Sequence, residues 1–169
     1  DPEIAAIVVG ACPHLGSSLE PALCQPDGRA RAQADLERAL GGWFAAPQIQ
    51  EALWAIELSI ELGDRGTTIA KAVARGAPAG QAGDRARASA LIVLAWTLPI
   101  DHATAELVSH AQPDDPLASV AALELARLGR GENALIALAS TAHTPADAAL
   151  AQLAADVAAG RQAPESAPL

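Results

Sequence analysis

Apolar positions along the chain recur with the spacing of α-helices, in short segments that glycine, proline and capping residues separate. Two segments show the spacing most clearly, with apolar residues three or four positions apart that we expect to face a core. These are Ile49, Leu53, Ile56 and Ile60 in the first, and Ala146, Leu150, Leu153 and Val157 in the second. The whole pattern predicts helices over residues 2–11, 29–40, 47–62, 67–75, 84–98, 101–111, 115–128, 132–141 and 145–159.

Local signals mark most of the predicted helix boundaries. Glycines follow the helix ends, where a left-handed residue is favoured, and side-chain oxygens or prolines stand at the helix starts. The glycines are Gly63, Gly76, Gly129 and Gly160, the capping residues are Thr67, Asp84, Asp101, Asp115 and Thr144, and the prolines are Pro47, Pro116 and Pro145.

The predicted helices also recur in pairs. First members begin near residues 47, 84, 115 and 145, so one unit spans about 30 to 37 residues. A single pair cannot bury its apolar face alone, and stacking against neighbouring pairs supplies the missing surface. The period therefore predicts a solenoid of stacked antiparallel helix pairs.

One of these units resembles a HEAT repeat of the short bacterial kind. An Asp115-Pro116 turn opens its first helix, small alanines follow, Leu128-Gly129 ends that helix, and Leu135 and Leu138 lie in the second. The resemblance implies an all-α, right-handed α-solenoid over residues 47–160. The preceding unit departs from the family at Leu98-Pro99, and the last has only its first helix. Tetratricopeptide repeats have a similar period, but this chain lacks their tyrosines.

Composition agrees with one helical unit. Hydrophobic residues make up 51% of the 169 residues but aromatic residues only 2%, so alanine and leucine, which favour helix over strand, dominate. The formal charge of −9 disfavours nucleic acid as a partner. Arg85 and Arg87 form a local basic pair that could bind a partner's carboxylates, with a solvated helix start as the alternative.

The region 1–46 departs from the repeats and is expected to be an N-terminal helical cap, while 161–169 is expected to be a disordered tail. Cys12 and Cys24 are the only cysteines, and they form either a disulfide or two buried thiols. A disulfide, together with the absence of methionine, suggests that a leader was removed and the protein exported to the periplasm or outside the cell. A trimmed cytoplasmic protein is the alternative. No apolar run approaches the roughly 20 residues of a membrane span.

No segment carries the spacing of a catalytic, metal or nucleotide motif, so we expect neither cofactor nor metal. Trp54 and Trp96 are expected in the core because an indole buries a large apolar area. Trp43 and Phe44 follow two glycines in a predicted connection, where they either pack under the cap or contact a partner.

These features favour a non-catalytic scaffold that binds another protein or belongs to a multi-subunit complex. The resemblance also implies a second class, an accessory enzyme or chaperone-type factor that acts through the repeat groove. A third is a structural subunit of a larger, possibly cell-envelope, assembly. Converging histidine and acidic residues in the groove would favour the enzyme, whereas alanine and leucine would favour binding.

Overall fold

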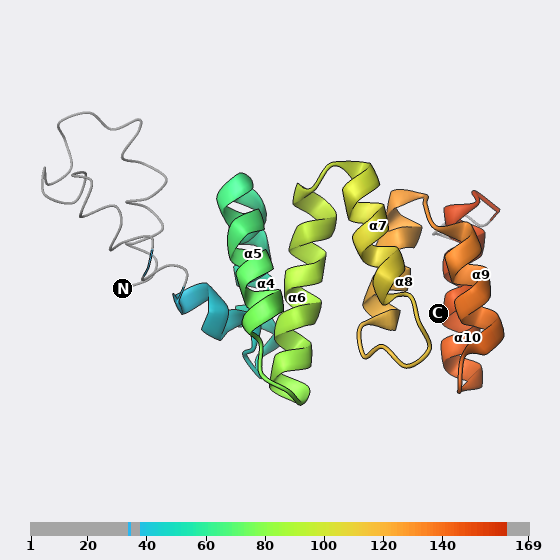
Figure 1. Ribbon diagram of the computed structural model, residues 1–169, viewed down its shortest axis with the longest axis horizontal. Coiled ribbons are helices and arrows are strands. Elements are labelled where there is room, and N and C mark those ends of the chain that lie inside the picture. Colours follow the sequence, from blue (N-terminus) through green and yellow to red (C-terminus); the bar gives the residue numbers. More distant parts are fainter. Residues whose placement is uncertain (1–33, 35–37, 162–169) are drawn as a thin grey trace, which may run out of the picture.

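The computed structural model describes residue 34 and residues 38–161, and within them every regular element is a helix (Figure 1). The chain is helical over 38–44 and then forms α4 (Ile49–Glu61), α5 (Asp64–Gly76), α6 (Gln81–Thr97), α7 (Ile100–His110), α8 (Ala118–Leu128), α9 (Glu132–Thr141) and α10 (Pro145–Ala158). The predicted all-α fold is therefore confirmed for this part of the chain. Cys12, Cys24, most of the predicted cap and the segment 162–169 lie outside the described residues.

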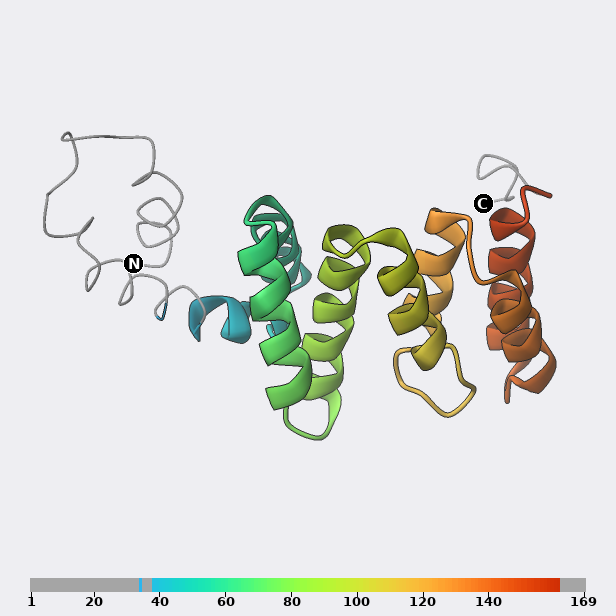
Figure 2. The same ribbon diagram turned by 45° about the horizontal axis from the view of Figure 1, so that its top comes forward.

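The helices follow one another along the long axis of the molecule, as two views of the ribbon show (Figures 1 and 2). Four of them, α4, α6, α8 and α10, pack in succession, each against the next. Between them, α5 packs on α4 and α6, α7 packs on α6 and α8, and α9 packs on α10. Among the described helices, none is long and apolar enough to cross a membrane.

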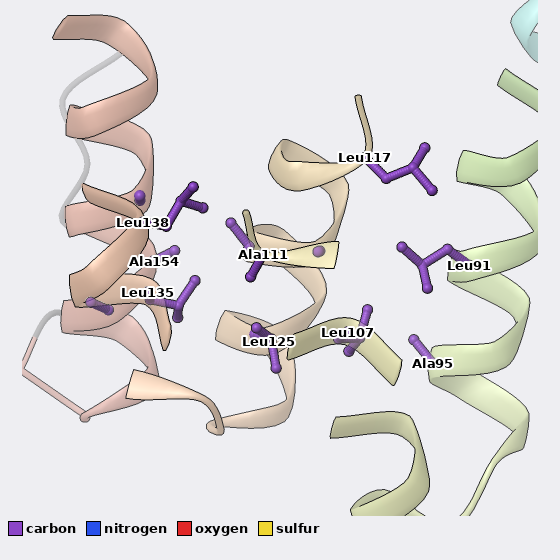
Figure 3. Close-up of a cluster of buried hydrophobic side chains, with 13 residues drawn as sticks. Leu91, Ala95, Leu107, Ala111, Leu117, Leu125, Leu135, Leu138 and Ala154 are labelled. Carbon is purple, nitrogen blue, oxygen red and sulfur yellow. The ribbon is translucent and has the colours of Figure 1, made fainter. Parts of the chain in front are cut away.

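Helix α6 joins two hydrophobic clusters. Ala90 and Val93 belong to a cluster shared with α4, α5 and the helix at 38–44, while Leu91 and Ala95 belong to a cluster shared with α7 to α10. Figure 3 shows Leu117 and other leucines of the second cluster bridging the space between α6 and the later helices. Because its apolar residues point in two directions, α6 is buried on two faces and connects the two halves of the structure.

Alanine forms much of the core in the last helices. Helix α10 buries Ala151, Ala154 and Ala155, whereas Leu153, predicted for the core, is 37% exposed. The prediction for α4 is likewise wrong at its start, where Ile49 is 77% exposed. A methyl-sized side chain lets two helices approach closely, so the packed face follows the small residues rather than the large ones.

Two predicted helix boundaries are confirmed, and at both of them a residue at the helix end itself forms the cap. Gly129 ends α8 in the left-handed conformation (φ 63°, ψ 40°), and the Thr144 hydroxyl accepts the Asp147 amide at 3.1 Å at the start of α10. The predicted caps Thr67, Asp84 and Asp101 are wrong, because α5, α6 and α7 begin earlier and include them in their first turns.

Candidate protein-interaction surfaces

Trp43 and Phe44 lie at the end of a helix rather than in a connection. Phe44 is fully buried, and the Ser89 hydroxyl donates to its carbonyl oxygen at 3.4 Å. Trp43 packs partly buried against the same cluster. Burial is the correct interpretation for Phe44, whose assignment as a partner contact is corrected because its side chain has no exposed surface.

Arg85 and Arg87 both bind within the chain. Arg85 Nη2 donates to the Ala45 carbonyl at 3.4 Å and so holds the end of the first described helix against α6. Arg87 Nη2 pairs with Asp84 Oδ1 at 2.6 Å, while its Nη1 donates to the Ala77 carbonyl at 3.1 Å. Each guanidinium thus fixes a connection, and a role in binding a partner stays a prediction.

An exposed apolar feature lies at Trp96, at the end of α6. The indole is 53% exposed, so the prediction of a core position is wrong. Arg127 of α8 lies over the ring, with its guanidinium carbon 4.1 Å from the ring centroid. Leu123, one turn before Arg127 and so on the same helix face, is 55% exposed. We call Trp96, Leu123 and Arg127 the tryptophan patch.

Arg127 is held in place by two further contacts. Its Nε donates to Glu124 Oε2 at 2.6 Å, and its Nη2 donates to the carbonyl oxygen of Ala95 at 3.2 Å. The carbonyl belongs to the last turn of α6, where a positive charge is favourable. The arginine therefore keeps the exposed indole in one orientation.

Trp54, on α4, is a second exposed tryptophan. It is 53% exposed on α4, next to Leu53, which is 44% exposed, so its predicted core position is also wrong. Ala55 and Ile56 take the buried positions instead. Two of the three tryptophans of the chain are thus half exposed to solvent.

A groove runs between α5 and α7 over the surface of α6. Its floor is apolar, one wall is basic and the other carries an acid and two histidines. The floor comprises Leu91, Leu94 and Leu98, the α5 wall Lys71, Ala74 and Arg75, and the α7 wall His102, Glu106 and His110. We call this the α5–α7 groove.

Lys71 and Arg75 are both exposed and lie one turn apart on α5. Over residues 38–161 neither side chain has an ion-pair or hydrogen-bond partner, and the Glu106 carboxylate is also unpaired there. The groove therefore presents two positive charges on one wall and one negative charge on the other, and the rest of the described chain pairs with none of them.

Two adjacent acidic residues stabilise the connection between α7 and α8. Asp115 Oδ2 lies 2.8 Å from His110 Nδ1, and Asp114 Oδ1 lies 2.8 Å from His143 Nε2. The other oxygen of Asp115 accepts the Leu117 amide at 2.7 Å. Asp115 closes the turn before α8, but the predicted helix cap is wrong, because α8 begins at Ala118 and its N-cap residue Leu117 makes no side-chain cap bond. The sequence analysis predicted neither histidine partner, and His143 lies 29 residues from Asp114.

Within the described residues, no group of three histidine, cysteine or acidic side chains is arranged to hold a metal ion. The class that the fold defines is an all-helical protein with exposed aromatic and charged surfaces. Comparison with protein-family models, with curated proteins and with solved structures found no match.

Proposed function

We propose that this chain is a HEAT-like repeat protein, a right-handed α-solenoid over residues 47–160 that serves as a non-catalytic scaffold for another protein. The succession of α4, α6, α8 and α10, in which each helix packs on the next, supports the repeat assignment, while α9 packs chiefly on α10. The Asp115-Pro116 turn and the left-handed Gly129 at the end of α8 agree with the family pattern.

The tryptophan patch is the observation that carries the scaffold function. Tryptophan and arginine are the residues most enriched among those that dominate binding energy at protein interfaces. Stacking beneath Arg127 fixes the Trp96 indole before a partner arrives, which reduces the side-chain entropy lost on binding. The half-exposed ring keeps enough apolar surface for a partner to cover.

The partner is another protein or the remainder of a multi-subunit complex. The acidic charge of −9 speaks against nucleic acid. An exported location, periplasmic or extracellular, remains part of the proposal and depends on a bridge between Cys12 and Cys24, with a cytoplasmic location as the alternative.

Comparative affinity capture tests the scaffold function. We would capture proteins from the producing cells with the tagged wild type, with a Trp96→Ala, Leu123→Ser double variant, and with an Ile49→Ser control. Ile49 is 77% exposed on α4, whereas the tryptophan patch belongs to α6 and α8. We expect the double variant to retain the partner about tenfold less than the wild type and control.

Circular dichroism and thermal unfolding would verify that all three proteins are folded. Equal retention of the same proteins by the double variant would contradict the assignment of the patch. A wild type that retains no protein reproducibly would contradict the scaffold function itself.

The α5–α7 groove favours a second use of the scaffold, as a chaperone-type factor that holds a segment of another protein. Its floor is leucine, the lining that favours binding. Its acid and histidines all come from α7 and so do not converge from different helices, which gives the accessory-enzyme alternative less support.

A further inference from the structure

We propose that the α5–α7 groove binds an acidic segment of a partner protein, with apolar side chains of that segment set against its floor. This inference rests on the proposed scaffold function but concerns a surface other than the tryptophan patch. The observation behind it is the juxtaposition of the unpaired Lys71 and Arg75 with an apolar floor and an opposing Glu106.

No interaction within the described residues fully explains the two positive charges of the basic wall. Arg75 lies in the last turn of α5, where a positive charge is favourable to the helix itself. Lys71, one turn earlier, gains little from that effect and lies four residues from a like charge, which is slightly unfavourable. An anionic group between the two side chains would relieve their repulsion.

The surroundings restrict which anion fits. The chain carries a net charge of −9, so the two basic side chains of this wall stand within an acidic whole. A long polyanion such as nucleic acid would meet the acidic remainder of the surface. A short acidic protein segment would place its carboxylates at α5 while its uncharged part passes Glu106.

The floor provides a limited apolar contact. Leu94 is only 3% exposed, whereas Leu98 is half-buried and lines the groove together with Ala74 of the basic wall. One or two apolar side chains of the partner can therefore contact Leu98 and Ala74, while charge supplies most of the attraction. Binding of this kind weakens as salt screens the exposed charges.

The test uses fluorescence anisotropy with the whole chain and a short labelled peptide of glutamates and leucines. A peptide with glutamine in place of each glutamate and a peptide with lysine there are the comparison probes. The variants are Lys71→Glu with Arg75→Glu, and the milder Lys71→Gln with Arg75→Gln. Arg130→Glu is the matched control, because Arg130 is exposed, lies outside the groove and has no described ion-pair partner.

We expect the acidic peptide to bind the wild type and Arg130→Glu alike, and to bind both groove variants about tenfold more weakly. The glutamine and lysine peptides should bind the wild type weakly. Their affinity for the wild type should be no higher than the affinity of the groove variants for the acidic peptide. Absence of binding at low salt, equal binding to the groove variants, equal binding of the glutamine peptide, or an equal loss in Arg130→Glu would overturn the proposal.

The two proposals fail separately. Trp96→Ala should leave the anisotropy titration unchanged, because Trp96 does not line the groove. Loss of peptide binding with intact capture through the tryptophan patch would reject the groove ligand alone. Peptide binding without any captured protein would reject the scaffold function while leaving the ligand chemistry of the groove in place.

Discussion

Arg127 of α8 lies over the indole ring of Trp96 of α6, with 4.1 Å between the guanidinium carbon and the ring centroid. The contact joins the carboxyl-terminal ends of α6 and α8, and Arg127 also donates to the Ala95 carbonyl of α6. It therefore links the surface proposed for binding to the packing of α6 on α8.

A double-mutant cycle of Trp96→Ala and Arg127→Ala should reveal this link. An exposed cation–π contact contributes about 0.5–1 kcal/mol, so the two changes should be non-additive by about that amount in urea unfolding followed by circular dichroism. Arg130→Ala with Trp96→Ala is the control pair and should be additive. Additivity of the first pair would mean that the stacked geometry adds no stability.

Gly66→Ala should destabilise the packing of α5 on α4. A methyl group at Gly66 would lie 1.7 Å from the backbone oxygen of Ser59, which cannot move without displacing the helix. We expect a loss of about 1–3 kcal/mol or more in the free energy of unfolding. Gly76→Ala, at the end of the same helix and with nothing within 4 Å, should cost little or nothing. Equal effects of the two changes would contradict the close approach of α4 and α5.

Ser59→Ala should stabilise the protein. The Ser59 side chain is fully buried on α4, and within the described residues its hydroxyl has no hydrogen-bond partner. Replacing an unsatisfied buried hydroxyl by hydrogen removes a desolvation cost of about 1 kcal/mol. Ser89→Ala is the contrast, because the Ser89 hydroxyl bonds to the Phe44 carbonyl and its loss should lower stability. A decrease in melting temperature for Ser59→Ala would show that this hydroxyl has a partner.

Asp115→Ala should weaken the connection between α7 and α8. One oxygen of its carboxylate accepts the Leu117 amide and the other pairs with His110, so we expect a loss of about 1 kcal/mol or more. Asp114→Ala is the matched control, because the Asp114 side chain and its partner His143 are both largely exposed. Thermal unfolding would measure both variants, and a larger effect at Asp114 would reverse this assignment.

The pairing of Cys12 with Cys24 stays a prediction and decides the expected compartment. In the chain-entropy model, closing a loop of this size stabilises by about 3 kcal/mol in an oxidising compartment. Intact mass after alkylation under denaturing, non-reducing conditions should show no added label if the bridge forms. Two labelled thiols would reject the bridge and remove the main argument for export.

The sequence by itself determined the succession of helices. Breakers, caps and apolar spacing act within a few residues, which is why the predicted range of α9 matches the structure and Gly129 ends α8 as expected. Most other boundaries differ by only a few residues, because the first turn of a helix accepts several starting points. Interactions between residues close in sequence were therefore sufficient to predict the order and approximate bounds of these helices.

Tertiary packing decided which side of each helix is buried. The sequence placed Trp96 in the core, but packing left it exposed beneath Arg127, while Phe44, expected in a connection, became part of a buried cluster. Likewise, α10 turned Ala151 and Ala155 rather than Leu153 to its neighbours. An apolar stripe in the sequence shows only that the helix has a face that can be buried. The face that is buried depends on how closely neighbouring backbones approach, and that distance is a property of two helices together.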